Sequence, residues 1–266
     1  MVVEQRRFTY MSGLGQRQIL LASIVLVLVV ALGWYFWVRQ VDGMDGMAGR
    51  MGMTLGPFLV MWLPMVVAMM FLPVGASAMT AVAGDRAGGE LPARAAVFLL
   101  TYLVVWMLFG VAVYLVLAGA AQLVTIPAEN QKWLAAGIYL VAGVYQFLPV
   151  KERCRELCRS TRCEGLDEST TPATRYGGIV RAAARHGVSC VGCCAGFMVV
   201  LIAVGMANVL AMALLTVVIF AERFFYPRTV TRVAGALLLV AAVLTPFVSW
   251  LHPGLPGMHN HEPMMM

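Results

Sequence analysis

Charged side chains are scarce in this sequence. They make up 12% of its 266 residues, whereas 61% of the residues are hydrophobic. An average globular domain has about twice that share of charge. A soluble domain needs more polar cover than this chain can supply. The composition therefore excludes an ordinary soluble enzyme and predicts a protein that lies in a lipid bilayer.

The chain also lacks the sequence patterns of several common functions. Away from their ends, the long apolar runs contain no Asp, Glu, Lys, Arg or His. Intramembrane carboxylates usually mark proton relays and hard-ion pathways, so their absence argues against a proton-coupled antiporter and against a magnesium or calcium channel. There is no phosphate-binding P-loop and no Ser-His-Asp order, and four histidines are too few for a haem-rich or diiron core.

The apolar runs themselves predict an all-α fold, a polytopic transmembrane bundle of about seven helices. A spanning helix needs about 20 mostly apolar residues. The run at 188–221 is too long for one span, and the segment Gly205–Asn208 near its middle contains helix-breaking residues, so we divide it there. The predicted spans are Ile19–Val38, Leu55–Val82, Ala95–Ala121, Trp133–Val150, the two halves of 188–221, and Val233–Leu251.

The basic residues predict the orientation of this bundle. With the N-terminus inside and the C-terminus outside, all of the nineteen Lys and Arg except Arg39, Arg50 and Lys132 fall in inner segments, as the positive-inside rule requires. Topology and anionic lipid thus explain the net charge of +6 without nucleic acid. We expect one membrane domain over 1–266, with an outer Met/Gly/Asp-rich loop at 39–54, a basic inner loop with cysteines at 151–186 and an outer His/Met-rich tail at 252–266.

Methionine is frequent, with 19 copies, and several lie in these polar outer segments. A polar, Gly-rich segment has no core to fill, so packing does not explain them. Thioether sulfur and imidazole both bind copper. We interpret the loop and the tail as metal-contacting segments; the alternative is low-complexity sequence in which Met and His occur by chance. The candidate ligands are Met44, Met47, Met51, Met53, His259 and His261.

The second predicted span has its own methionines. Met61, Met65 and Met69 are each four residues apart, and Met70 follows directly. Residues at this spacing lie above one another on one helix face, so their sulfurs form a stripe. Methionine is also a common gap-filler in apolar packing. The stripe is therefore open to two interpretations, a metal pathway and ordinary core.

Three of the six cysteines are concentrated at the start of the fifth predicted span, on the inner side. Cys190, Cys193 and Cys194 are three and four residues apart, which places their sulfurs on one helix face. The cytoplasm keeps thiols reduced, and thiolate is a preferred ligand of Cu(I) and Zn(II). We predict a metal site here, with His186 before the cysteines and Met198 after them. Buried cysteine as a small apolar residue is the alternative.

Cys154 and Cys158 lie in the basic inner segment 151–186. They are further candidate ligands, but their spacing alone does not decide between a metal site and a flexible loop.

Several motifs together resemble a bacterial family of predicted metal-binding integral membrane proteins, also described as copper chaperones. The resemblance covers about residues 56–225 and implies metal binding, with copper as the metal, in a bacterial inner (cytoplasmic) membrane. Two positions depart from the family pattern: Val66, where the family tends to have paired methionines, and Ser77, where it tends to have a second proline. The matching motifs are Met61-Trp62 with Met65, Ala68-Met69-Met70 and Pro73; Tyr145-Gln146 with Pro149, Lys151, Cys154 and Cys158; His186-Gly187 with Cys190, Gly192, Cys193 and Cys194; and Gly205-Met206, Asn208 and Met212 leading to Glu222-Arg223.

These observations predict a membrane copper-handling protein that is not an enzyme. Methionine and histidine would bind Cu(I) outside, and copper would be delivered to or from the cysteines inside, with the direction left open; zinc is the other metal that suits the cysteines. The expected partners are the lipid bilayer, the copper ion, and a membrane cuproenzyme or other membrane subunits. Two alternatives stay open: a membrane thiol–disulfide oxidoreductase that uses Cys190 and Cys193, and a structural subunit of a larger membrane complex.

Overall fold

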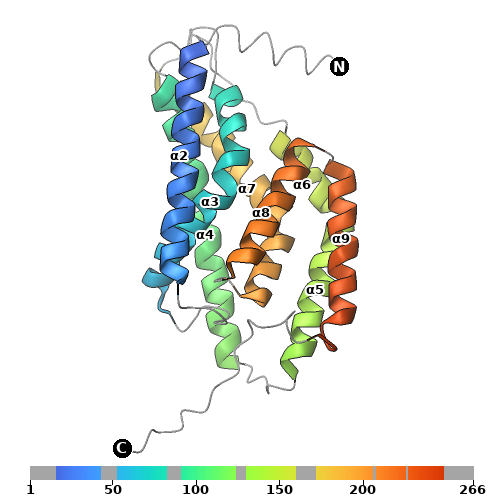
Figure 1. Ribbon diagram of the computed structural model, residues 1–266. Coiled ribbons are helices and arrows are strands. Elements are labelled where there is room, and N and C mark those ends of the chain that lie inside the picture. Colours follow the sequence, from blue (N-terminus) through green and yellow to red (C-terminus); the bar gives the residue numbers. More distant parts are fainter. Residues whose placement is uncertain are drawn as a thin grey trace, which may run out of the picture. The chain divides into compact units, whose positions relative to one another are not determined.

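The described part of the chain is all-α, as predicted. The computed structural model describes residues 16–42, 53–82, 91–123, 130–159, 172–205, 208–225 and 227–248. Within these ranges the chain forms eight helices and no strand. The helices are α2 (Gln16–Val41), α3 (Leu55–Val82), α4 (Leu91–Leu123), α5 (Gln131–Phe147), α6 (Pro149–Arg159), α7 (Pro172–Val204), α8 (Val209–Phe224) and α9 (Pro227–Leu244) (Figure 1).

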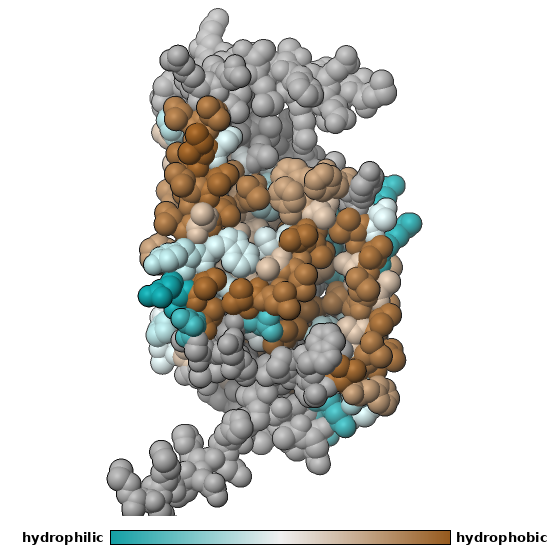
Figure 2. Space-filling view, viewed as in Figure 1, coloured by the Kyte–Doolittle hydropathy of each residue, from teal (hydrophilic) through white to brown (hydrophobic). Residues whose placement is uncertain are grey.

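Several of these helices are long and apolar enough to cross a membrane. Among the described residues, four helices qualify, and a fifth span results if the bent pair α5 and α6 counts as one. Many large apolar side chains are exposed, and Figure 2 shows them over much of the visible described surface. Such a surface is compatible with a lipid environment. Seven spans and their inside–outside orientation stay predictions. The four qualifying stretches are Leu20–Val41, Leu55–Gly75, Pro92–Ala120 and Tyr176–Ile202.

The helices form two compact units, which we describe separately. α4 and α7 each contribute to both units, and the single domain expected over 1–266 stays a prediction. The first unit comprises Met1–Gln40, Leu55–Val113 and Pro149–Cys194; the second comprises Val41–Thr54, Tyr114–Leu148 and Ala195–Met266.

In the first unit, α3 is the most deeply buried of the membrane-length helices, and it is apolar on all faces, as expected for a helix surrounded by protein. Its Trp62 stacks on Phe58, with 5.6 Å between ring centroids. The indole N–H of Trp62 donates a 3.1 Å hydrogen bond to the carbonyl of Trp106 on α4. A Cβ at Gly110 would lie 2.7 Å from the indole nitrogen, so glycine allows this close approach. The contact fixes α4 against α3.

In the second unit, α9 packs along α5 and also against α8, and α5 and α9 lie side by side in Figure 1. Small residues allow the close packing: a Cβ at Gly143 would lie 3.2 Å from the backbone nitrogen of Leu239. Glu222 of α8 is buried and accepts a 2.5 Å hydrogen bond from the hydroxyl of Thr231 on α9. The core contains Ala135, Tyr139, Ala142, Val200 and Ala242.

The helix break predicted at Gly205–Asn208 is confirmed. α7 ends at Val204, and Gly205 has φ 107°, a left-handed conformation that suits glycine. The side chain of Asn208 then caps α8 by accepting a 2.9 Å hydrogen bond from the amide of Ala211. The other end of the helix differs from the expectation, because α7 begins at Pro172 and not at 188. Proline suits the first turn of a helix.

We expect Asn208→Ala to lower the free energy of unfolding by about 1 kcal/mol, because it leaves one amide of α8 without its cap. Equilibrium unfolding of the purified protein in detergent would measure this change. Asn130 is the matched control, since it caps α5 without a side-chain hydrogen bond. An equal loss in Asn130→Ala and Asn208→Ala would show that the capping bond contributes nothing.

Candidate metal centre

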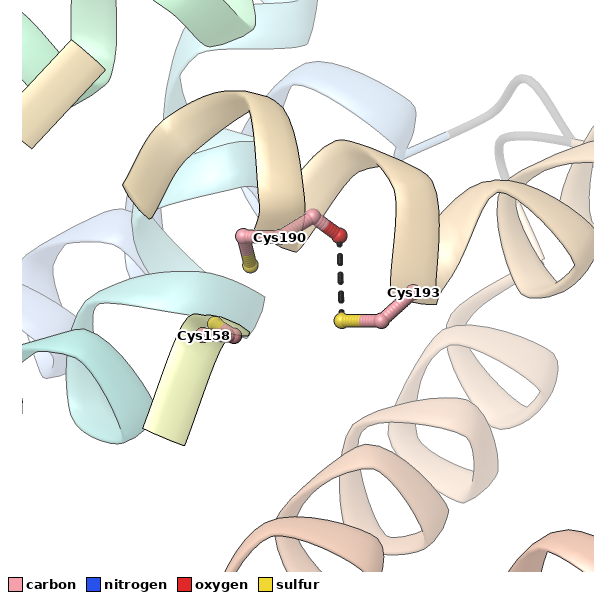
Figure 3. Close-up of side chains that lie close together, drawn as sticks. All are labelled: Cys158, Cys190 and Cys193. Carbon is pink, nitrogen blue, oxygen red and sulfur yellow. Dashed lines mark hydrogen bonds between the residues drawn. The ribbon is translucent and has the colours of Figure 1, made fainter. Parts of the chain in front are cut away.

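Three cysteines from two helices converge in the first unit. Cys158 lies on α6, and Cys190 and Cys193 lie one turn apart on α7. Their three sulfur atoms all lie within 4.8 Å of one another. Figure 3 shows the sulfurs of Cys190 and Cys193 on the side of α7 that faces Cys158. Segments far apart in the sequence thus build one group of soft donor atoms.

Helix α6 positions Cys158, and local sequence features explain why this helix forms. Pro149 is its first residue and Glu152 lies in its first turn, and both are favourable at a helix N-terminus. Glu152 also accepts a 3.2 Å hydrogen bond from Arg155. Lys151, Arg155 and Cys158 are buried, and their spacing places them on one face of the helix. That face turns Cys158 into the unit.

Glycine allows α6 to lie close to α7. A Cβ at Gly192 would lie 2.7 Å from the sulfur of Cys154, which is tighter than ordinary van der Waals contact. Cys154 is half-buried and precedes Cys158 by one turn. Gly192 therefore leaves room for the Cys154 side chain, and the close approach of the two helices brings Cys158 within reach of Cys190 and Cys193.

The sulfurs have hydrogen-bond partners on two helices, α4 and α7. The hydroxyl of Tyr102 on α4 lies 3.1 Å from the sulfur of Cys190. The thiol of Cys193 donates to the Cys190 carbonyl at 3.2 Å (Figure 3). The sulfur of Cys158 lies 3.6 Å from Nε2 and 3.9 Å from Nδ1 of His186. All of these groups except Cys193, which is half-buried, are buried, so the contacts are made away from water.

His186 supplies nitrogen to this environment. Its ring packs near two aromatic rings of α4, with 5.8 Å between centroids to each of Phe98 and Tyr102. Packing of this kind restricts how the imidazole can turn. Imidazole together with thiolates is a donor set that Zn(II) and copper both accept.

The spacing of the sulfurs fits one ion. A metal with sulfur bonds of about 2.3 Å and three sulfurs around it separates each pair of sulfurs by about 4 Å. The observed group, with every pair within 4.8 Å, needs only small side-chain adjustments to reach that geometry. The sulfur of Cys194 lies 3.6 Å from that of Cys193, so it is available as a further soft donor. The residues present fit a soft metal ion.

The sequence-predicted ligands fall into three groups. His186, Cys158, Cys190, Cys193 and Cys194 are brought together, and Cys154 lies beside them against Gly192. The methionines Met61, Met65, Met69 and Met70 are buried in the first unit, and Met198 is buried in the second. Met53 is half-buried, whereas Met44, Met47, Met51, His259 and His261 lie outside the described residues.

Two features of the site do not follow from the sequence analysis. The first is the partnership of Cys158 with Cys190 and Cys193. The first-turn signals of α6 and the helical spacing of its buried residues could have indicated a helix there, although not its partner. The second is Tyr102, which has no distinguishing sequence signal because it is one of several aromatic residues in an apolar run.

The fold and the site together define a class: an all-α protein with membrane-length apolar helices and a buried, thiol-rich donor set for a soft metal ion. The chain matches the family model of the PpoB2 copper chaperones over residues 59–245. This match spans well over half of the chain, so the protein belongs to that copper chaperone family. No curated protein matches the chain, and no solved structure matches it.

Proposed function

We propose that this protein is a membrane copper chaperone that holds Cu(I) between Cys158, Cys190 and Cys193 and delivers it to a partner. One observation carries the proposal: three thiols from two helices lie within 4.8 Å of one another, in a chain of a copper chaperone family. His186 and Cys194 are the additional ligands that we propose for the same ion.

A group of neighbouring soft ligands suits the transfer of a copper ion from one ligand to the next. Cu(I) accepts thiolate and thioether sulfur readily, so it can pass from one sulfur to the next without leaving a soft environment. Cys194 lies next to the three-cysteine group, and Cys154 lies against Gly192, which stands between two members of the group in the sequence. We propose that they act in loading and release.

The methionines would form the outer part of the route. In the first unit the stripe on α3 is buried in protein, with Met65 0% exposed; a lipid-facing stripe could not conduct copper. We propose that Met44, Met47, Met51 and Met53, together with His259 and His261, capture copper on the outer side of a bacterial inner membrane. Copper would then move along the α3 methionines toward the cysteines, within a bundle of seven spans.

The test is metal binding by the reduced, purified full-length protein. We expect one Cu(I) per chain, retained against a competing Cu(I) chelator, and an X-ray absorption spectrum with a sulfur shell at about 2.3 Å. A parallel titration with Zn(II) decides between the two metals that accept this donor set. Absence of tight Cu(I) binding by the folded protein would overturn the proposal.

Transport and delivery are separated by a second measurement. In sealed proteoliposomes, a transporter moves copper into the lumen, whereas a chaperone only binds it and releases it to an acceptor. Because the thiolates bind Cu(I) more strongly than thioethers do, we expect release to need a thiol-containing acceptor such as a membrane cuproenzyme precursor. Copper accumulation in the lumen without any acceptor would contradict delivery and favour transport.

A further inference from the structure

Tyr102 contacts the candidate metal centre from a helix that carries none of the cysteines. Its hydroxyl lies 3.1 Å from the sulfur of Cys190. Tyr102 is 0% exposed and Cys190 is 8% exposed, so water does not compete for the contact. The ring also lies against His186, with 5.8 Å between ring centroids. One side chain therefore touches both a sulfur and an imidazole of the site.

The hydrogen bonds at the sulfurs respond differently to metal binding. Cys193 donates its thiol proton to the Cys190 carbonyl, and this bond is lost when Cys193 becomes a thiolate. The Tyr102 hydroxyl keeps its own proton and can donate it to a Cys190 thiolate. A hydrogen bond to an ionised acceptor is shorter and about twice as strong as a neutral one. The Tyr102 contact is therefore the one that gains strength in the metal-bound state.

The position of Tyr102 is itself well determined. α4 is held against α3 by the hydrogen bond from Trp62 to the Trp106 carbonyl, one turn beyond Tyr102. The Tyr102 ring also packs at 6.4 Å from the ring of Trp106. A donor that is fixed before the metal arrives loses little side-chain freedom when the bond tightens.

We propose that Tyr102 is a positioning residue of the copper site, which donates a hydrogen bond to the Cys190 thiolate and holds its sulfur toward the ion. The proposal rests on the proposed function, because it assumes that Cys190 is a ligand. Groups that orient metal ligands typically change metal affinity by about 10- to 100-fold when they are removed. Tyr102 would set how firmly copper is retained.

The test compares Tyr102→Phe with Tyr139→Phe in the full-length, reduced protein. Both changes remove one buried hydroxyl, but Tyr139 lies in the core of the second unit. We expect Tyr102→Phe to weaken Cu(I) binding about tenfold or more, measured by competition with a chromophoric Cu(I) chelator at several pH values around neutral. We also expect the loss to grow toward acidic pH, where protons compete for Cys190, and the thiolate-to-copper absorption band to shift.

A purely structural role would give a different result. Wild-type affinity, pH profile and absorption band in Tyr102→Phe would overturn the proposal while leaving the copper site itself intact. Wild-type protein that binds no Cu(I) would overturn both. A second pair, Tyr102→His with a ring donor and Tyr102→Leu without one, covers the case in which Tyr102→Phe does not fold. Equal affinity within that pair would also overturn the proposal.

Discussion

Replacing Cys158 alone by serine should weaken Cu(I) binding by about 100-fold. A four-ligand structural zinc site is worth about 10–16 kcal/mol, which is roughly 3 kcal/mol for each ligand, and 1.4 kcal/mol corresponds to a factor of about ten. The serine hydroxyl is a hard donor and does not replace thiolate on a soft ion. Because Cys158 is the only member of the three-cysteine group on α6, its loss reduces the group to α7 ligands.

Cys154→Ser is the matched control, since Cys154 precedes Cys158 by one turn on the same helix and lies outside the three-cysteine group. We expect it to change the Cu(I) affinity far less than Cys158→Ser does. The variant Cys190→Ser/Cys193→Ser/Cys194→Ser gives the background Cu(I) affinity of a protein whose α7 cysteines are removed. Chelator competition under reducing conditions measures all three. Copper affinity that is unchanged in Cys158→Ser would mean that α7 binds the ion alone.

Trp62→Ala should destabilise the protein by about 3–5 kcal/mol, the range for truncating a buried large aromatic residue. Trp62 is 1% exposed, stacks on Phe58 and donates to the Trp106 carbonyl. Its removal leaves a cavity and a carbonyl without that donor. Since α4 carries Tyr102, we also expect weaker Cu(I) binding at temperatures where the variant is still folded.

Thermal and denaturant unfolding in detergent would measure the loss, with Trp133→Ala as the control. Trp133 is 59% exposed, so its truncation opens no cavity, and we expect a much smaller change in the free energy of unfolding. Equal destabilisation by the two substitutions would show that the contact of Trp62 with α4 contributes nothing to the free energy of unfolding.

The helices and the break between α7 and α8 could be predicted from the sequence because their causes are local. Apolar runs longer than a bilayer needs predicted membrane-length helices, and four were found among the described residues. Gly205 and Asn208 marked a break because glycine accepts a positive φ and asparagine caps a helix. The early start of α7 at Pro172 was missed, because a polar, basic segment before an apolar run is also typical of a loop.

The cysteine site could be predicted from the sequence only in part. The spacing of Cys190, Cys193 and Cys194 determines that they share a helix face, and the structure keeps that arrangement. Nothing local tells which other thiol completes the set. The answer depends on α6 packing against α7, which Gly192 permits by accommodating Cys154.

By itself, the sequence determined an all-α, membrane-compatible protein with soft ligands, because hydrophobic run length and helical spacing act over neighbouring residues. Tertiary structure alone decided that Cys158 joins Cys190 and Cys193, that the α3 methionines are buried, and that Tyr102 reaches a sulfur. These contacts join residues that are up to 88 positions apart. They arise when whole helix faces pack, and the free energy that selects one packing is distributed over many side chains at once.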